Sequence, residues 1–254
     1  MEYEEYKKLY DSLNRPDDVQ KFIEKGYDHR LIETLYTQKT SRDVKKRFHI
    51  IKDKSPILLR EWKRGRTLME IADKNRFPPI LIAMLIFQED GASKKRFWEF
   101  VRSPELLESP QTADEIREVV KNDLVYSPAA DERHKERGVW GETLLQNWLN
   151  EQNITYKTEN DLRGGEGQKT PDCLLDEPMT YDGKKICWIE SKASFGDNVE
   201  FRLNSRKQLC PYTQLFGPGL VVYWTGCLND LECPPDVYVS DISVLEKKLG
   251  KFTE

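Results

Sequence analysis

The spacing of apolar residues divides the chain into a helical first half and a second half with short strands. From residue 1 to about residue 125, apolar residues recur at helical spacing, and prolines and glycines interrupt the pattern. A further helix is expected from Asp131 to Gln152. The chain is expected to close with a strand at 236–239 and a short helix from Ile242 to Leu249. The interruptions in the first half fall at Pro16, Gly26, Ser55-Pro56, Gly65, Pro78-Pro79 and Gly91.

A faint internal repeat with a period of 39 residues lies within the helical half. An isoleucine follows both Gly26 and Gly65 six residues later, and a phenylalanine follows each 22 residues later. Each copy predicts a helix, a glycine turn, a helix and a further helix, which is the outline of a helix-turn-helix unit. Chance similarity between helices is the alternative. The segment 80–87 is almost wholly apolar and is expected in the core, because reading base edges requires polar side chains.

A β-hairpin is predicted in the second half. Asp182-Gly183 separates two apolar runs, and glycine accepts the positive φ of such a turn. Asp172 is expected on the first strand of this hairpin, and Glu190 and Lys192 on the second. Side chains alternate along a strand, so Glu190 and Lys192 point to one face and Ser191 to the other. Two carboxylates and one ammonium are therefore expected to converge on the sheet.

This group has the chemistry of a divalent-metal site that hydrolyses phosphodiesters. Hard cations such as Mg²⁺, for which Mn²⁺ can substitute, take oxygen ligands, and one or two carboxylates suffice to hold them. Lys192 would supply a fixed positive charge near water or a phosphate oxygen. The alternative is a solvated hairpin with an ordinary Glu–Lys surface, because Pro-Asp and Glu-x-Lys both recur elsewhere in the chain.

Two other segments extend the pattern. Glu142 lies in the helix expected upstream, and Gln208 and Tyr212 lie four residues apart downstream. The run 219–224 is continuously apolar, as in a buried central strand. The ordered set Glu, Pro-Asp, Glu-x-Lys, Gln-x-x-x-Tyr resembles the motif set of the PD-(D/E)xK nuclease superfamily. It is most similar to the branch of that superfamily that includes archaeal Holliday-junction resolvases. The strings TPDC (170–173), ESKASFGD (190–197) and FGPGLV (216–221) resemble the TPD-motif family, whose eukaryotic members are described as codanin-interacting nucleases.

The resemblance implies an α/β, restriction-endonuclease-like fold with a mixed central sheet flanked by helices. It implies metal ligation by Asp172 and Glu190, with Glu142 acting directly or through water, and Lys192 as the catalytic lysine. Gln208 and Tyr212 would orient substrate or water. Pro211 is a departure from a continuous helix between them, since proline breaks or begins a helix. The implied activity is that of a DNA endonuclease, including branched or structured DNA, with a protein partner.

Composition restricts the remaining classes of protein. Charged residues make up 33% of the 254 residues and the formal net charge is −4. No apolar run approaches the roughly 18 residues of a membrane helix. The acidic start Met1-Glu2-Tyr3-Glu4-Glu5 does not read as a signal peptide, so an intracellular location, cytoplasm or nucleus, is expected. The five cysteines form no Cys-x-x-Cys pair, which favours reduced thiols over a zinc ribbon. A bridge between Cys227 and Cys233 is the alternative.

Basic residues concentrate between Lys39 and Arg66. These 28 residues hold 11 Lys or Arg against three acids, an excess of eight positive charges in an acidic chain. Such a stripe is expected to contact a phosphate backbone, although charge runs are often only solvated helix faces. Three more basic residues follow the Glu-x-Lys strand. The candidates for nucleic-acid binding are Lys45, Lys46, Arg47, Arg60, Lys63, Arg64, Arg66, Arg202, Arg206 and Lys207.

A domain boundary is predicted at residues 126–130. Residues 1–125 would be a helical, helix-turn-helix-like nucleic-acid-binding domain with a net charge of +2, and residues 126–254 a nuclease domain with a net charge of −6. An acidic domain does not attract DNA by its overall charge, so the basic stripe would do much of the holding. The glycine-rich segment 162–168 is either a phosphate cradle or a flexible loop. The alternatives to a DNA nuclease are an RNA nuclease and a non-catalytic nucleic-acid or protein-binding module. The sequence leaves the oligomeric state open.

Overall fold

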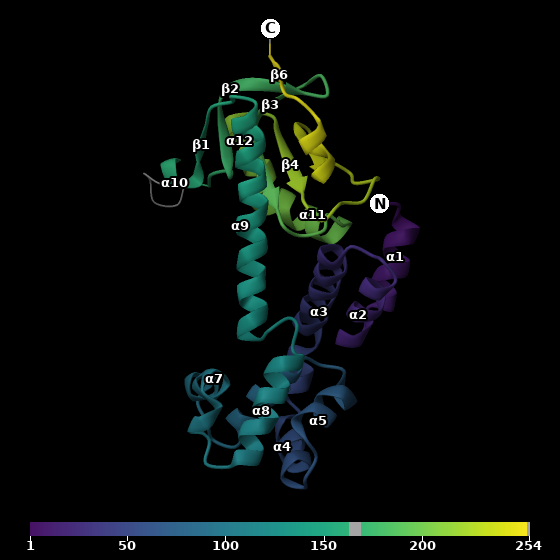
Figure 1. Ribbon diagram of the computed structural model, residues 1–254, viewed down its shortest axis with the longest axis vertical. Helices are drawn as coiled ribbons and strands as arrows, with labels where there is room; N and C mark the ends of the chain where they lie inside the picture. The colour runs from purple at the N-terminus through teal and green to yellow at the C-terminus, as the bar shows by residue number, and fades with distance from the viewer. Residues whose placement is uncertain (163–168, 253–254) are drawn as a thin grey trace. The chain divides into compact units, whose positions relative to one another are not determined.

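The structure is a computed structural model that describes residues 1–162 and 169–252 (Figure 1). The glycine-rich segment, apart from Leu162, lies outside the described residues. The chain divides into two compact units, one made of residues 1–12, 27–34 and 135–254, the other of residues 13–26 and 35–134. The first is called the sheet unit and the second the helical unit. The boundary predicted at 126–130 coincides with the start of helix α9 (Pro128–Glu151). The helical unit includes this helix up to residue 134, and the rest of it belongs to the sheet unit.

The helical unit packs around one wholly apolar helix. Every residue of α6 (Pro79–Glu89) from Ile80 to Phe87 is buried, which confirms that this segment is core. Asp123 accepts a hydrogen bond from the Ile80 N–H at 3.1 Å and so caps the start of α6, which Pro78 and Pro79 leave short of donors. The other elements are α2 (Pro16–Glu24), most of α3 (His29–Lys52), α4 (Ser55–Lys63), α5 (Leu68–Asn75), α7 (Lys94–Arg102), the 3₁₀ helix η1 (Pro104–Leu106) and α8 (Pro110–Asn122).

The predicted repeat is wrong in its first copy. In the second copy a break separates α5 from α6, as expected, but α3 runs unbroken through the corresponding part of the first. The second copy breaks because Arg76 adopts a left-handed conformation (φ 48°) and Pro78-Pro79 follows. The equivalent segment of α3, residues 37–40, contains no proline or glycine, so nothing interrupts the helix.

The sheet unit is an α/β structure, as predicted. The strands lie in the order β1-β2-β3-β4-β5, with β6 beside β2. β2 and β3 form the predicted antiparallel hairpin, and both turn residues, Asp182 and Gly183, have positive φ. β4 pairs in parallel with both β3 and β5, so the sheet is mixed. The strands are β1 (Tyr156–Thr158), β2 (Cys173–Tyr181), β3 (Lys184–Lys192), β4 (Gly219–Tyr223), β5 (Val237–Asp241) and β6 (Gly250–Lys251).

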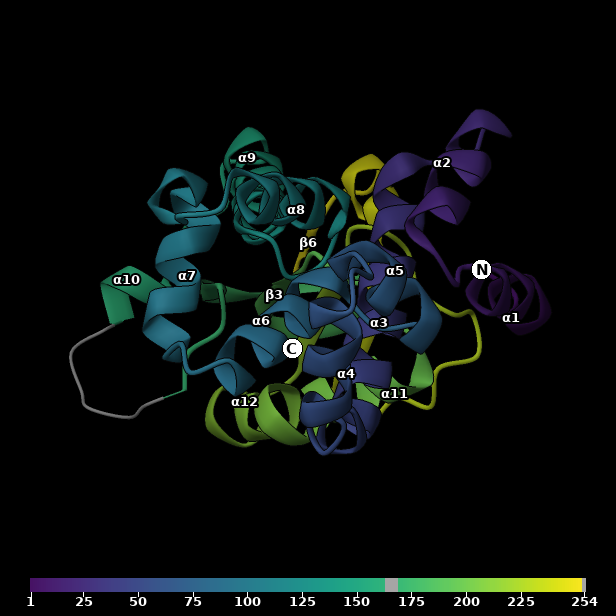
Figure 2. The same cartoon turned by 90° about the horizontal axis from the view of Figure 1, so that it is seen from below.

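Helices cover both faces of the sheet (Figure 2). Leu145, Trp148 and Leu149 of α9 (Pro128–Glu151) pack on one face, together with the 3₁₀ helix η3 (Ile242–Glu246). On the other face lie α11 (Asn198–Asn204), the π-helical segment η2 (Ser205–Leu209) and α12 (Cys210–Phe216). Every residue of β4 is buried, which confirms it as a central strand. The unit also contains α1 (Tyr3–Ser12) and α10 (Glu159–Leu162).

Three further outcomes concern the C-terminal end, the cysteines and the helices. The predicted helix from Ile242 to Leu249 is instead the short η3, and the chain then leaves it to form β6 beside β2. All five cysteines are free, so Cys227 and Cys233 are not bridged. Within the described residues, no helix has the length and apolar character that crossing a bilayer requires.

Candidate active site

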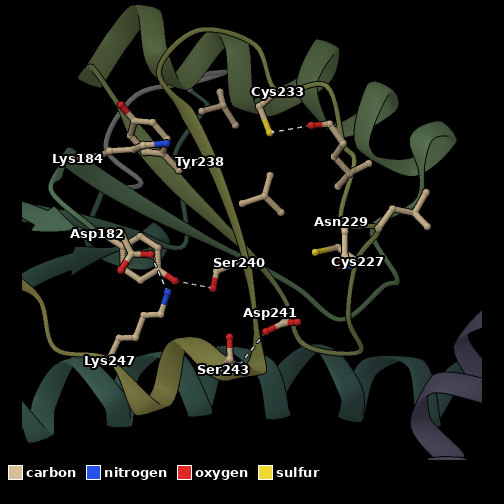
Figure 3. Close-up of a pocket in the computed structure, with 15 residues that line it drawn as sticks. Asp182, Lys184, Cys227, Asn229, Cys233, Tyr238, Ser240, Asp241, Ser243 and Lys247 are labelled. Atoms are coloured by element: carbon tan, nitrogen blue, oxygen red, sulfur yellow. Dashed lines mark hydrogen bonds and ion pairs between the residues drawn. The ribbon is translucent and has the colours of Figure 1, made fainter. Parts of the chain in front are cut away.

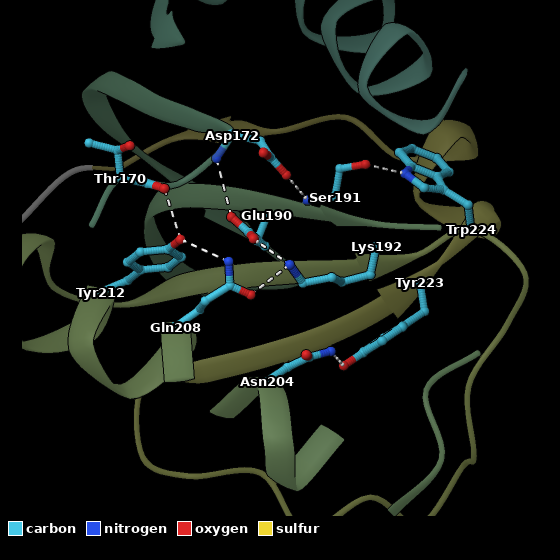
Figure 4. A network of polar contacts seen from close by, with 10 residues as sticks. All are labelled: Thr170, Asp172, Glu190, Ser191, Lys192, Asn204, Gln208, Tyr212, Tyr223 and Trp224. Carbon is cyan, nitrogen blue, oxygen red and sulfur yellow. Dashed lines mark hydrogen bonds and ion pairs between the residues drawn. The ribbon is translucent and has the colours of Figure 1, made fainter. Parts of the chain in front are cut away.

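The third strand of the sheet places an acid and an amine on the same face. Lys192 Nζ lies 2.5 Å from Glu190 Oε1, and both residues face α11, η2 and α12 (Figure 4). Ser191, between them, points the other way and accepts a hydrogen bond from the Trp224 indole N–H at 2.7 Å. The alternation predicted from the sequence is therefore confirmed. Glu190 is buried, with only 2% of its surface exposed.

Asp172 lies directly before β2, not on the strand as predicted, and is tied to Glu190 through the backbone. Its own N–H donates to Glu190 Oε2 at 3.2 Å. In return, the N–H of Ser191 donates to Asp172 Oδ2 at 2.7 Å. Each carboxylate is thus held by the strand segment that carries the other. This reciprocal pairing brings the two predicted ligands together at one end of the hairpin.

Gln208 and Tyr212 also belong to this group of polar side chains, which is called the cluster: Asp172, Glu190, Lys192, Gln208 and Tyr212. Lys192 Nζ donates to Gln208 Oε1 at 2.8 Å, and Gln208 Nε2 donates to the Tyr212 hydroxyl at 3.5 Å. The Tyr212 hydroxyl donates in turn to the carbonyl oxygen of Thr170 at 2.8 Å, two residues before Asp172. The contacts therefore form a continuous chain from the TPD segment through the helical layer to the Glu-x-Lys strand (Figure 4).

Pro211 is accommodated without loss of this geometry. The turn before it is π-helical, Ser205 to Leu209, and Pro211 occupies the first turn of α12. A proline is tolerated there because the N–H groups of the first helical turn have no partner inside that helix. Single π turns inside helices occur often at functional sites. The helical layer therefore continues past Pro211, and Gln208 and Tyr212 remain in contact.

Glu142 lies on α9 and is exposed. Its carboxyl group is nevertheless partly desolvated, which raises its pKa; the negative charge of Asp172 raises the pKa further, while Lys192 lowers it. Glu142 thus interacts electrostatically with the cluster. Among the described residues, no group of three or more His, Cys, Asp or Glu side chains is arranged to hold a metal ion. Asp172 and Glu190 form the acidic pair, and a metal-binding role for Glu142 stays a prediction.

The electrostatics of the pair suit a hard cation. Burial raises the pKa of Glu190, and the charge of Asp172 adds to this effect. Burial also raises the pKa of Asp172, although the Ser191 N–H and Lys192 oppose the rise. The one ammonium group of Lys192 therefore offsets only part of the negative charge of the two desolvated carboxylates. An oxygen-only donor set with excess negative charge fits Mg²⁺ or Mn²⁺, which retain waters beside one or two carboxylates.

The basic residues proposed for nucleic-acid binding fall in both units. Arg202, Arg206 and Lys207 are exposed on α11 and η2, the helical segment that also carries Gln208. Arg47 differs from the rest in being half-buried. Its guanidinium donates to Asp43 and to the carbonyl oxygens of Asn75 and Arg76 at 2.6–3.0 Å, and so holds parts of the helical unit together. The remaining candidates are exposed on α3, α4 and the turn after α4: Lys45, Lys46, Arg60, Lys63, Arg64 and Arg66.

The sequence reading missed the support behind the cluster. Trp224 follows β4, and its indole reaches Ser191 on the α9 face. Gly141 lets α9 approach, since a Cβ there would lie 2.5 Å from Trp224 Cδ1. Asp197 caps α11 by accepting from the N–H groups of Val199 and Glu200, and it also accepts from the Tyr6 hydroxyl at 2.7 Å. The sequence offered one sign of this close packing, which is a glycine within a predicted helix beside a predicted acidic ligand, Gly141-Glu142.

The FGPGLV string has a packing explanation. A Cβ on Gly219 would lie 2.0 Å from the Trp188 ring, so only glycine allows the indole to lie across β4. The Trp188 indole N–H donates to the Gly217 carbonyl oxygen at 2.8 Å, and Gly217 has a positive φ of 86°. Trp188 is fully buried and packs edge-on against Tyr212. These glycines therefore position a wall of the cluster.

A separate cavity of about 450 Å³ lies beside β5 (Figure 3). Its charged residues interact with neighbours: Lys247 pairs with Asp182 at 2.7 Å, and Lys184 lies over the Tyr238 ring. The Tyr181 hydroxyl bonds the Ser240 hydroxyl at 2.7 Å. None of the side chains predicted for catalysis lines this cavity, which is therefore not the candidate active site.

The geometry defines an α/β protein that brings a buried acid, a half-buried acid, a lysine and a glutamine together at one end of its sheet. The family model described as "Protein of unknown function TPD sequence-motif" matches residues 108–243, more than half of the chain. The chain belongs to this TPD-motif family.

Curated relatives share the name "CDAN1-interacting nuclease 1". The zebrafish (Danio rerio) protein is 30% identical over an alignment of 272 positions, covering 96% of this chain and 90% of that protein. The Xenopus laevis protein is 36% identical over 173 residues, 65% of this chain and 57% of the relative. The human protein is 34% identical over 173 residues, 65% of this chain and 62% of the relative. The latter two matches thus span less than two thirds of the relatives. No solved structure matches the chain.

Proposed function

We propose that the chain is a divalent-metal-dependent nuclease that hydrolyses phosphodiester bonds in DNA. The observation that carries the proposal is the joint placement of Asp172, Glu190, Lys192 and Gln208, linked by contacts of 2.5–3.2 Å. The relatives that bear the name nuclease support the same class of reaction. Branched or otherwise structured DNA is the proposed substrate class, and a protein related to CDAN1 is the proposed partner.

Asp172 and Glu190 would hold the cation, which when bound supplies Lewis-acid charge that activates water and offsets the charge of the phosphate. Lys192 directs its ammonium into the same space, where it can hold a phosphate oxygen or orient water. Gln208 fixes the position of that ammonium through the 2.8 Å contact with its Oε1. Tyr212 anchors the carbonyl of Thr170, so the segment leading to Asp172 keeps its place.

A metal-dependent cleavage assay tests this proposal. Labelled duplex, flap, splayed, junction and single-stranded DNA, with matched RNA, are incubated with the full chain in Mg²⁺, Mn²⁺ or EDTA. We expect cleavage of structured DNA that requires the metal. Asp172→Ala and Lys192→Ala should each lower the rate on the order of 10²-fold or more. Lys157→Ala, at an exposed position of β1, is the matched control and should retain full activity.

Metal binding is read independently of activity. Mg²⁺ or Mn²⁺ should raise the melting temperature of the wild-type protein, because a ligand that binds only the folded state stabilises it. Asp172→Ala should lose this shift. Cleavage by a folded Lys192→Ala variant at the wild-type rate would refute the assignment of the lysine. Nucleic-acid binding without cleavage of any substrate would make the chain a binding module, and cleavage of RNA alone would make it an RNA nuclease.

A further inference from the structure

The helical unit contains a cavity of about 440 Å³ that the candidate active site does not use. It is formed by the start of α2, the middle of α3, the turn from α5 to α6 and the segment after α8. Its volume falls within the range typical of small-molecule sites. Its lining combines apolar side chains with several basic ones, which is an unusual mixture for a packing defect.

The apolar wall is preformed. Phe77 and Tyr36 are buried, and the consecutive prolines Pro78 and Pro79 add rigid apolar surface beside them. Arg47 stiffens this side of the cavity, since its guanidinium is held by Asp43 and two carbonyl oxygens and lies 5.8 Å from the centre of the Phe77 ring. Little reorganisation is therefore needed for a flat apolar group to enter.

Arg76 occupies a backbone conformation that arginine does not favour. It ends α5 with φ 48° and ψ 57°, the left-handed region in which glycine or asparagine is usual. Its side chain is exposed and lines the cavity. A long cation thus stands at a strained position that suits glycine, and strained backbone concentrates at ligand clamps.

The lining of the cavity carries four basic side chains against three acidic ones. Neither Arg15 nor Arg76 has an ion-pair partner anywhere in the described parts of the chain. Of the acids in the lining, Asp43 pairs with Arg47, and Asp123 accepts hydrogen bonds from the N–H groups of Ile80, Val125 and Tyr126. Only Asp73 remains to oppose the two arginines. An anionic group is therefore favoured beside them.

We propose that this cavity binds one nucleotide unit, with the base against the Tyr36 and Phe77 wall and the phosphate at Arg15 and Arg76. The choice of a nucleotide rests on the proposed nuclease function, which gives the chain a nucleic-acid substrate. Apolar and aromatic walls with basic residues are the usual means of holding an unpaired base and its phosphate. The unit could come from an unpaired or terminal position of a DNA strand or from a free nucleotide.

Binding is measured by titration calorimetry in EDTA, so that no cleavage contributes. The probes are deoxythymidine monophosphate, deoxythymidine, inorganic phosphate and a short oligodeoxythymidine with and without a 5′ phosphate. We expect the phosphorylated probes with a base to bind more tightly than deoxythymidine or phosphate alone. Binding of the monophosphate identifies a free nucleotide as sufficient, whereas binding of the oligonucleotides alone identifies a strand as the source.

Arg76→Gly is the informative variant. Glycine relieves the left-handed conformation, so the fold should be at least as stable, while affinity should fall about tenfold or more because a charge-assisted contact is lost. Arg15→Ala should weaken binding to a similar extent. Arg117→Ala, an exposed arginine of α8 outside the cavity, is the matched control. Asp172→Ala should bind like the wild type, which separates this test from that of the catalytic site. Unchanged affinity in both Arg76→Gly and Arg15→Ala, or no binding by any probe, would overturn the proposal.

Discussion

Trp224 donates its indole N–H to Ser191 Oγ at 2.7 Å, on the face of β3 opposite Glu190 and Lys192. The backbone N–H of Ser191 donates to Asp172 Oδ2, also at 2.7 Å. One residue of the strand therefore connects the core beneath α9 to the acid of the TPD segment. This connection depends on close packing of α9, since Gly141 leaves only enough space for a hydrogen atom beside the indole.

Gly141→Ala should destabilise the sheet unit. The new Cβ would lie 2.5 Å from Trp224 Cδ1 and 3.0 Å from Ser191 Oγ, so the indole must move and its hydrogen bond weakens. Overpacking of this kind costs about 1–3 kcal/mol. The measurement is urea unfolding followed by tryptophan fluorescence and circular dichroism.

Gly138→Ala is the matched control in the same helix, because nothing lies within 4 Å of a Cβ at that position. Alanine is the better helix former, so this variant should gain about 0.5–1 kcal/mol. Equal stability changes in the two variants would show that the space between α9 and Trp224 is not the limiting feature.

The stability of the metal-free protein should fall as pH rises from 5 to 8. Burial and the charge of Asp172 raise the pKa of Glu190 to about 7, against an ordinary value of 4.5. Between these values the folded state holds a proton that the unfolded state has released, so raising the pH favours unfolding. One pKa unit corresponds to about 1.4 kcal/mol, so the loss of stability between pH 5 and pH 8 is on the order of 2–3 kcal/mol.

Glu190→Gln keeps the shape of the side chain and removes its titration. In EDTA at constant ionic strength, denaturant unfolding of this variant should depend less steeply on pH than that of the wild type. Asp182→Asn, at the exposed hairpin turn, is a suitable control and should retain the wild-type slope. A wild-type protein whose stability is flat across this range would mean that Glu190 titrates near its ordinary pKa.

The hairpin and its acids could be predicted because local signals and packing agree. Asp182-Gly183 specifies the turn, and strand alternation alone puts Glu190 and Lys192 on the same face. The contact of Gln208 with Lys192 could not be predicted from helical spacing, because it depends on a π turn that lets Pro211 begin a new helix. The role of Trp224 could not be predicted from the sequence either, because it depends on how closely α9 approaches β3. The helix break predicted in the first copy of the repeat was wrong because the two copies match in their glycines and apolar residues but not in the prolines that break a helix.

Tyr212→Phe should lower both stability and cleavage. The hydroxyl donates to the Thr170 carbonyl oxygen and accepts from Gln208, so its loss leaves a partly buried carbonyl unpaired and frees the segment before Asp172. A cost of about 1–2 kcal/mol is expected. Tyr156→Phe removes a comparable but exposed hydroxyl contact, 3.3 Å from Asn150, and should change neither quantity. Unfolding and single-turnover cleavage are measured on both variants, and a Tyr212→Phe protein with wild-type behaviour in both would remove Tyr212 from the site.

The basic residues of the helical unit should separate into structural and binding groups. Arg47 is partly buried and donates to Asp43 and two carbonyl oxygens, so Arg47→Ala should cost about 1–2 kcal/mol of stability. Arg64 is exposed at the end of α4, and Arg64→Ala should leave stability within about 0.5 kcal/mol. If Arg64 contacts a phosphate, its loss weakens DNA binding regardless of sequence and lowers the salt dependence of log K by about one.

These two variants are compared by unfolding and by fluorescence anisotropy with a labelled duplex at several salt concentrations. The Arg64→Ala protein should fold normally and bind DNA with a shallower salt slope, whereas the Arg47→Ala protein should lose stability first. An unchanged salt slope in Arg64→Ala and in Lys46→Ala would mean that the stripe is a solvated helix face. Nucleic-acid contact would then fall to Arg202, Arg206 and Lys207, beside the cluster itself, because these are the remaining exposed candidates.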